Sequence, residues 1–379
     1  MVGGGEGAFI GAVHRRAAVM DGQIELTAGA FDIDPEKGRR FGVEEMYLDP
    51  ARSYGSFKEM AEAEARLGSG GGAIDFVSIV TPNHVHFPVA RTFLEAGFHV
   101  VCEKPMTISL DEAQQLRNIV EETGKIFCLT HTYTGYPMVK QAKHMVASGQ
   151  VGEIRKIIVE YPQDWLLTRV ELEGVAQAVW RTDPKQSGPA GALGDIGTHC
   201  ANLVHYITGL EVMEVCAEMR TCLEGRRLDD DVNVLMKYNN GAHGILQVSQ
   251  ISAGEENHLT IRIYGDKCSL HWDQEHPNYL TVKTPGEPVR IYSRGQGYLC
   301  EQARLACRIP PGHPEAFIEA FANIYLGAAT AIRKAESGAD QPPAPDFPDV
   351  MDGVRGMAFI ETVIESACSK NKWIPFEKF

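Results

Sequence analysis

Short apolar runs alternate with amphipathic stretches over the first third of the chain. The apolar runs have few polar positions, which is typical of strands covered on both faces; they are residues 24–31, 74–81, 98–102 and 126–130. Helical spacing appears between them, at residues 56–67, 84–96 and 110–122. This alternation predicts a parallel sheet with crossover helices. Only Met1 and Val2 precede the first glycines, so we expect this sequence to start inside the first strand, either because the start is truncated or because the numbering begins late.

The pattern changes from about residue 153. Period-two alternation and short turns such as Asn240-Gly241 and Gly265-Asp266 predict antiparallel hairpins. The expected strands are residues 154–161, 212–223, 232–238, 243–251, 259–264, 268–272 and 279–282. Helical stretches return at 313–335 and 350–366. We therefore expect an α/β Rossmann domain over residues 1–135. An α+β domain with a large, mostly antiparallel open sheet follows over 136–379, and its last helices are expected to pack back on the first domain.

Composition narrows the class of protein. A length of 379 residues favours two domains. The net charge of −14 argues against nucleic-acid or anionic-membrane partners. No apolar run reaches the roughly 18 to 20 residues of a membrane span, and no secretory signal is visible. The nine cysteines are scattered without metal-ligand spacing, which favours a reducing, cytoplasmic location and no metal site.

The glycine-rich start predicts a phosphate-binding turn. Glycines let a backbone approach a pyrophosphate, and the following helix N-terminus supplies N–H donors. The pattern Gly3-x-Gly5-x-x-Ala8 fits the dinucleotide fingerprint, although the turn is longer than usual. The expected contacts are Gly3, Gly5, Gly7, Ala8, Phe9 and Ile10. A plain glycine loop is the alternative.

Asp32 ends the expected second strand, 21 residues after Gly11. An acid at this offset meets the adenosine ribose hydroxyls and would repel a 2′-phosphate, which favours NAD. Lys37, Arg39 and Arg40 follow closely and keep NADP open.

Two further motifs carry candidate chemistry. Glu103-Lys104-Pro105 follows an expected strand, so Lys104 would point into the crevice beyond the carboxyl ends of the sheet. Asp195 and His199 would share one face if a helix begins at Gly194. The alternatives are a solvated Glu–Lys pair, a helix cap with a core histidine, or an Asp/His metal pair.

Together these features resemble the glucose–fructose oxidoreductase/inositol dehydrogenase family (Gfo/Idh/MocA) over essentially the whole chain. Its marks here are the glycine turn, Thr81-Pro82-Asn83-x-x-His86, Glu103-Lys104-Pro105, Trp180-Arg181 and Gly194-Asp195-x-Gly197-x-His199. The resemblance implies NAD or NADP as the cofactor. It also implies that the cofactor contacts Thr81, Pro82, Asn83, His86, Glu103, Lys104, Trp180 and Arg181.

The implied reaction is oxidation of a secondary hydroxyl of a sugar, glycoside or cyclitol by hydride transfer. His199 suits the base, because an imidazole titrates near neutral pH. Lys104 would stabilise the reacting oxygen, and Asp195 would orient the substrate or tune His199.

Substrate contacts are expected from aromatic and amide side chains. Tyr161, Gln163 and Trp165 alternate, so a strand would place all three on one face; ordinary core aromatics are the alternative. Tyr133 and His313, the latter in Gly312-His313-Pro314-Glu315, complete the expected substrate set.

Two other functions compete with a cofactor-releasing dehydrogenase. One is a sensing protein that kept the fold and lost the chemistry, and the other is an oxidoreductase with a permanently bound cofactor. The expected partners are a small sugar or polyol and further copies of this chain, as a homodimer or homotetramer.

Overall fold

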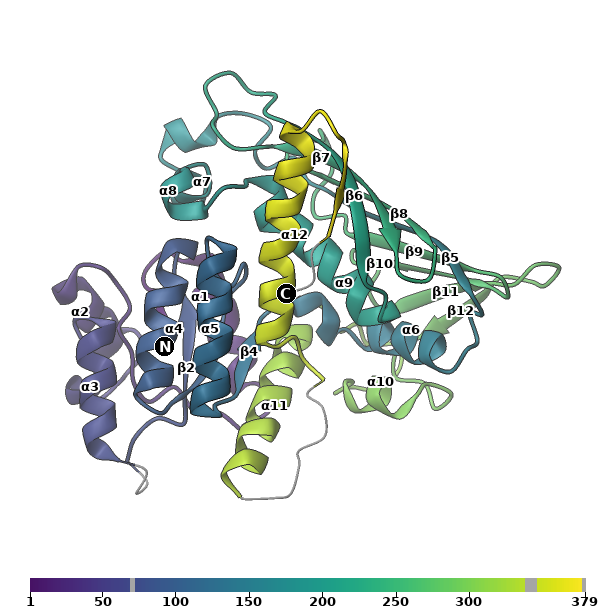
Figure 1. Ribbon diagram of the computed structural model, residues 1–379. Helices are drawn as coiled ribbons and strands as arrows, with labels where there is room; N and C mark the ends of the chain where they lie inside the picture. Colours follow the sequence, from purple (N-terminus) through teal and green to yellow (C-terminus); the bar gives the residue numbers. More distant parts are fainter. Residues whose placement is uncertain (69–71, 338–345, 377–379) are drawn as a thin grey trace. The chain divides into compact units, whose positions relative to one another are not determined.

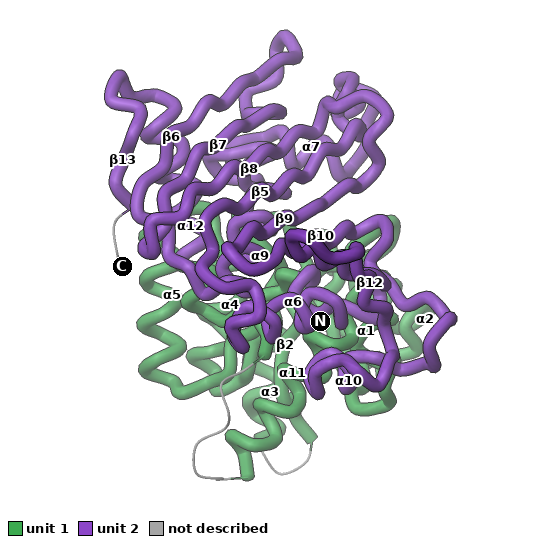
Figure 2. Tube along the Cα trace, turned by 90° about the vertical axis from the view of Figure 1, so that its right-hand side faces the viewer, with its two compact units in different colours: residues 1–131, 321–354 green, residues 132–320, 355–379 purple. Residues whose placement is uncertain are grey.

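A computed structural model describes residues 1–68, 72–337 and 346–376. The chain divides into two compact units, drawn in green and purple in Figure 2. Unit 1 contains residues 1–131 and 321–354, and unit 2 contains residues 132–320 and 355–379. Unit 1 thus combines the N-terminal third of the chain with a late segment that includes most of one long helix.

Unit 1 is a Rossmann domain. Its sheet has the order β1-β2-β3-β4, with parallel neighbours throughout, and its strands are Val2–Gly3, Phe76–Val80, His99–Cys102 and Phe127–Leu129. The main helices are α1 (Phe9–Val19), α2 (Pro35–Glu44), α3 (Phe57–Leu67), α4 (His86–Glu95), α5 (Leu110–Thr123) and α11 (Phe317–Glu336). In Figure 1, α4 and α5 lie side by side, and α4 also packs on β2 and β3.

The expected strand at 24–31 is not formed as a regular strand. Only isolated bridges occur there, from Ala30 to Val2 and from Gly29 to Ser53. The neighbouring strand β1 has just two residues, so the ladder is limited to a few hydrogen bonds, including Gly3 N to Ala30 O at 2.8 Å. The segment still delivers Asp32 to the edge where β1 ends.

Unit 2 contains a nine-stranded sheet in the order β12-β11-β10-β9-β5-β8-β7-β6-β13. All neighbouring pairs are antiparallel except β5 and β8, so the mostly antiparallel sheet predicted from the sequence is confirmed. Its strands are β5 (Ile154–Pro162), β6 (Val212–Arg220), β7 (Asp231–Tyr238), β8 (His243–Ser249), β9 (Thr260–Gly265), β10 (Ser269–Asp273), β11 (Tyr279–Lys283), β12 (Arg290–Ser293) and β13 (Trp373–Pro375). The last two were not expected, because both are short and one is rich in polar residues.

Helices cover one face of this sheet. The helix α6 (Pro137–Ala147) packs on β10 and β11, and α9 (Thr198–Thr208) packs on β5. The remaining helices of the second half are α7 (Ala176–Arg181), α8 (Pro184–Ser187), α10 (Glu301–Leu305) and α12 (Val350–Cys368). In β7, Val232, Val234 and Met236 are buried, whereas Leu235 between them is 47% exposed. Apolar side chains thus occur on both faces of β7.

None of the described helices is long and apolar enough to cross a membrane.

Candidate functional site

The glycine turn is packed backbone against backbone. A Cβ on Gly3, whose φ is +78°, would lie 2.9 Å from the carbonyl oxygen of Val80. A Cβ on Gly11 would lie 2.4 Å from the Cα of Gly4. Helix α1 therefore approaches the turn most closely at Gly11. The last position of the fingerprint, where a small residue permits this close packing, was expected at Ala8, but Ala8 is the N-cap residue of α1.

A cavity of about 510 Å³ opens beside this turn. Its walls come from the glycine turn, the first half of α1 and one side of α2. They include Gly5, Gly7, Ala8, Phe9, Arg15, Lys37 and Arg40, together with the carboxylates of Glu6, Glu44 and Glu45. Gly7 has a φ of +76°, and a Cβ there would meet no atom within 4 Å. Open backbone, a helix N-terminus and three basic side chains suit the phosphates of a dinucleotide.

Thr81 supplies a second sign of a ligand. Its Oγ1 atom is buried and has no hydrogen-bond partner among the described residues. A buried hydroxyl without a partner is costly, so a ligand group that bonds to it would remove the penalty. Thr81 directly follows β2, at the carboxyl edge of the sheet where Rossmann domains bind their ligands.

Asp32 lies at the same edge and already has protein partners. Its Oδ2 atom is 3.2 Å from Lys37 Nζ, and its Oδ1 atom accepts the N–H of Asp34 at 3.0 Å. The side chain of Asp34 in turn caps α2. A carboxylate held in this way is available to ribose hydroxyls, but Lys37 offsets part of its charge.

Another cavity in unit 1, of about 670 Å³, lies elsewhere. It is lined by Met1, Asp75 and Phe76, at the amino ends of β1 and β2. Ligands of open α/β sheets bind beyond the carboxyl ends, so the cavity beside the glycine turn, and not this one, is the candidate cofactor site.

Glu103 joins several parts of unit 1. Its Oε1 atom accepts His14 Nε2 at 2.8 Å and Thr130 Oγ1 at 2.5 Å, and its Oε2 atom accepts the N–H of Lys104 at 3.2 Å. Burial alone would raise the pKa of Glu103, but the hydrogen bond and charge of His14, together with Lys104, outweigh it and lower the pKa to about 2. The side chain expected to contact the cofactor is thus committed to protein partners.

His131, which follows β4, is a buried residue that the sequence analysis missed. Burial, and then the charge of Lys104, lower the pKa of His131 to about 3, so a neutral imidazole lies near the Lys104 ammonium. Lys104 itself is half-buried. No periodicity marks His131, and it becomes apparent only when the ends of β3 and β4 are seen as neighbours.

His86 was expected to line the cofactor crevice, but its ring is fully buried. Its nitrogens lie 2.8 Å from Pro105 O and 2.9 Å from Thr81 O. His86 therefore ties the Thr81 loop to the Glu103-Lys104-Pro105 loop, and it can act on a cofactor only through them. Asn83, in the same motif, is also largely buried.

In unit 2, His199 lies on the first turn of α9. Its ring meets the ring of Tyr133 edge-on, with centroids 4.8 Å apart. Asp195 lies just before α9, in a π-helical turn, η5, that is formed by residues Leu193–Gly197. Such turns insert an extra residue, so Asp195 and His199 do not have the simple spacing of one α-helical face.

Asp195 is oriented by two side chains. The amide of Gln250, a residue that sequence analysis missed, donates to Oδ2 at 2.8 Å, and Arg181 Nε lies 3.4 Å from Oδ1. The Arg181 guanidinium also lies over the ring of Trp180, 4.2 Å from its centroid, and 5.9 Å from that of Trp165. The Trp180-Arg181 motif and Asp195 therefore form one cluster.

A chain of hydrogen bonds joins the expected substrate residues. Asn257 Oδ1 accepts Tyr161 Oη at 2.7 Å and Gln163 Nε2 at 2.6 Å, and Gln163 Oε1 accepts Trp165 Nε1 at 3.1 Å. The hydroxyl of Tyr161 also bonds to that of Tyr133. The strand β5 ends at Pro162, so these hydrogen bonds, and not strand alternation, bring the three residues together.

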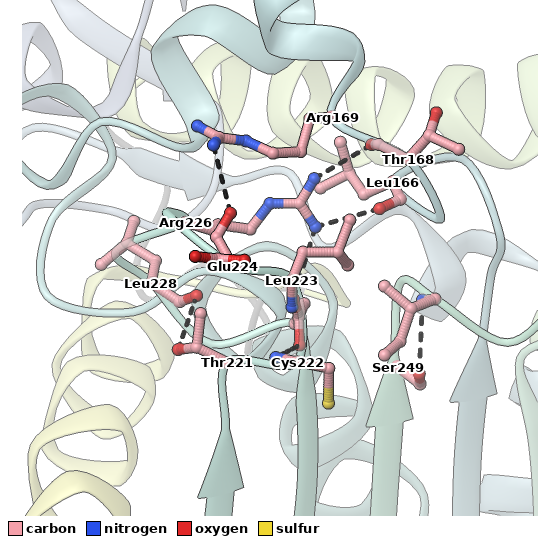
Figure 3. Close-up of polar contacts among 12 residues, drawn as sticks. Leu166, Thr168, Arg169, Thr221, Cys222, Leu223, Glu224, Arg226, Leu228 and Ser249 are labelled. Atoms are coloured by element: carbon pink, nitrogen blue, oxygen red, sulfur yellow. Dashed lines mark hydrogen bonds and ion pairs between the residues drawn. The ribbon is translucent and has the colours of Figure 1, made fainter.

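Arg226 fixes the loop that follows Trp165. Its guanidinium donates to Leu166 O at 2.9 Å and to Thr168 O at 3.1 Å, as Figure 3 shows. It also pairs with Asp230 at 3.4 Å and with Glu171 at 3.1 Å, and its side chain is only 1% exposed. The loop is thus anchored to the hairpin between β6 and β7.

His313, by contrast, is exposed. Its neighbour Glu315 is buried and bonds to Arg294 at 2.7 Å and to the N–H groups of Arg308 and Ile309. The motif around His313 is therefore explained by loop anchoring, and its contact with substrate stays a prediction.

Comparison with known proteins supports this description. Residues 1–131 match the model of the oxidoreductase family with an NAD-binding Rossmann fold, and residues 139–271 match the GFO/IDH/MocA C-terminal domain. The chain belongs to the Gfo/Idh/MocA family of oxidoreductases. Its first unit is the NAD-binding Rossmann domain of this family.

Three relatives of this Gfo/Idh/MocA oxidoreductase are informative. The uncharacterized oxidoreductase YfiI of Bacillus subtilis is 36% identical over 100% of this chain and 96% of its own length. An inositol dehydrogenase homologue from Azotobacter vinelandii, solved with NAD+, is 38% identical with a TM-score of 0.92, covering 99% of this chain and 96% of its own; it was also solved with NADH and myo-inositol. A levoglucosan dehydrogenase from Pseudarthrobacter phenanthrenivorans is 28% identical over 55% of this chain and 58% of its own.

Proposed function

We propose that the protein is an NAD-dependent dehydrogenase that oxidises a secondary hydroxyl of a cyclitol, a sugar or a glycoside, with cyclitols as the first choice. The observation that carries this proposal is the set of polar groups in unit 2. Asp195, Gln163 and Tyr161 are held by hydrogen bonds, and two tryptophan rings accompany them. A ring with many hydroxyls needs such polar partners and apolar faces.

The chemistry is divided among three residues. His199 takes the hydroxyl proton, Lys104 hydrogen-bonds the reacting oxygen as negative charge develops on it, and Asp195 holds a neighbouring hydroxyl. NAD, when bound, accepts the hydride. Tyr133 packs on the imidazole of His199 and limits the orientations that this ring can take.

The test is a panel of inositols, pyranoses and glycosides, with NADH formation followed by absorbance. The proposal predicts turnover of at least one cyclitol or sugar, with kcat/KM highest for a ring that has several adjacent hydroxyls. Absence of turnover throughout the panel, with NAD bound, would favour the sensing protein.

A permanently bound cofactor is distinguished by one further observation. The purified protein would then show reduced-nicotinamide absorbance after sugar is added without any NAD in solution. Our proposal predicts no such band until NAD is supplied.

We also propose self-association through the sheet of unit 2. Leu235, Tyr264, Tyr279 and Ile291 lie on its strands and are exposed, and an antiparallel sheet can leave one face uncovered. Light scattering at micromolar concentration is expected to give the mass of a dimer or tetramer; a monomer would refute this assembly.

A further inference from the structure

A buried chain of polar side chains crosses unit 1 and centres on His14. The imidazole is 0% exposed. Its Nδ1 atom lies 2.7 Å from the hydroxyl of Tyr325 on α11, and its Nε2 atom lies 2.8 Å from Glu103 Oε1. The Tyr325 hydroxyl in turn bonds to Ser78 on β2. His14 therefore contacts both the late helix of unit 1 and the loop that carries Lys104.

The direction of the bond to Glu103 follows from charge. A carboxyl with a pKa near 2 is ionised at neutral pH and can only accept hydrogen bonds. His14 must consequently carry a proton on Nε2 and donate it. A hydrogen bond to a buried carboxylate is among the stronger ones in proteins, so this contact restrains the Glu103 side chain.

Glu103 passes that restraint to Lys104. Its other oxygen accepts the backbone N–H of Lys104 at 3.2 Å, so the carboxylate fixes the start of the lysine from within the loop. His14 is anchored on α1, three residues beyond Gly11, where that helix touches the glycine turn. Helix α1 thus reaches from the cofactor cavity to the carboxylate that holds Lys104.

We propose that His14 is a positioning residue for Lys104 and acts through Glu103. This inference rests on the proposed role of Lys104 in the reaction. The alternative is that these side chains only provide one another with hydrogen-bond partners in the core and have no role in the reaction. It predicts a loss of stability without a specific loss of turnover.

Two matched variants separate these explanations. His14→Gln extends an amide to the position of Nε2 and keeps a donor for Glu103, whereas His14→Asn reaches only the position of Nδ1 and keeps Tyr325. Displacement of a reacting group by about 1 Å can cost about 100-fold in rate. We expect His14→Asn to lower kcat roughly 10- to 100-fold, with the Kd for NADH, measured by fluorescence titration, within about threefold of wild type. His14→Gln should recover most of that loss.

Tyr325→Phe is the control for burial. It removes the other partner of His14 and leaves Glu103 bonded, so it should lower the melting temperature while kcat stays near wild type. A double-mutant cycle of His14→Asn with Glu103→Gln should be non-additive in kcat, because both changes break one linkage.

Equal kcat in the Asn and Gln variants would overturn the inference, as would additive effects in the cycle. If His14→Asn proves unstable, the comparison of His14→Gln with Glu103→Gln remains: the inference requires a kcat loss in the second and not in the first. Lys104→Ala distinguishes a failure of the proposed role of Lys104 from a failure of the inference about His14. Full activity in that variant would refute the proposed role of Lys104, whereas an inactive Lys104→Ala beside a fully active His14→Asn would refute this inference alone.

Discussion

Substitution of Gln250 tests whether Asp195 binds the substrate. Gln250 is the first residue after β8 and is 2% exposed. Its side-chain amide donates a hydrogen bond to Asp195 Oδ2 at 2.8 Å. Gln250→Leu keeps the approximate volume and removes this donor. Asp195 would then keep its contact with Arg181, at 3.4 Å, but would lose the shorter of the two bonds.

The size of the effect follows from the type of bond. A hydrogen bond to a charged group contributes about 1.5–3 kcal/mol. If Asp195 binds the substrate, this corresponds to a fall in kcat/KM of roughly 10- to 150-fold. The Kd for NADH should change little, because Gln250 does not line the cavity beside the glycine turn in unit 1.

The matched control is Gln247→Leu, the same change on β8 at a half-buried position. Initial rates for the preferred polyol, with thermal melts of both variants, complete the experiment. Equal kcat/KM in the two variants would refute the reasoning. A melting point that falls without any change in kcat/KM would show that Gln250 serves stability alone.

Three further predictions concern stability and cofactor choice. Arg226→Ala removes the cation paired with the buried carboxylate of Asp230, which keeps only backbone N–H donors, and should lower the unfolding free energy by about 3–5 kcal/mol in urea titrations. Arg227→Ala, at an exposed ion pair, should lower it by about 0–1 kcal/mol. The pKa of Glu103 is about 2 in the folded protein against an ordinary 4.5, so its ionised carboxylate stabilises the fold fully above pH 4.5 and less and less as the pH falls toward 2. The urea midpoint should therefore fall further between pH 6 and pH 3 in wild type than in Glu103→Gln. Asp32→Ser should shift the NAD-to-NADP ratio of kcat/KM toward NADP by roughly tenfold or more, and an unchanged ratio would contradict a 2′-facing Asp32.

Local patterns predicted much of the architecture. The apolar runs that became β2, β3 and β4 and the alternating runs that became β5 to β11 depend on burial within a few residues, which the chain itself displays. The segment at 24–31 has an equally apolar pattern but remains irregular, because strand formation also needs a partner ladder and β1 offers only two residues.

The candidate site was predictable only in part. Lys104 and Asp195 occur in recognisable motifs, as do their partners Glu103 and Arg181, but Gln250 and His14 do not. Gln250 and His14 are each more than 50 residues from the side chain they orient, at Asp195 and Glu103 respectively. No short-range pattern encodes such contacts. The π-helical turn at Asp195 was equally hidden, since a single inserted residue leaves the apolar spacing of α9 almost unchanged.

The most direct test of the central claim is hydride transfer itself. Myo-inositol deuterated at every ring carbon is incubated with the protein and NAD, and the nicotinamide product is analysed by mass spectrometry. The account predicts NADH that carries one deuterium, formed by wild type and reduced roughly 10²- to 10⁴-fold in His199→Ala. The same assay with deuterated glucose covers the sugar alternative. Undeuterated NADH, or full activity in His199→Ala, would contradict the account.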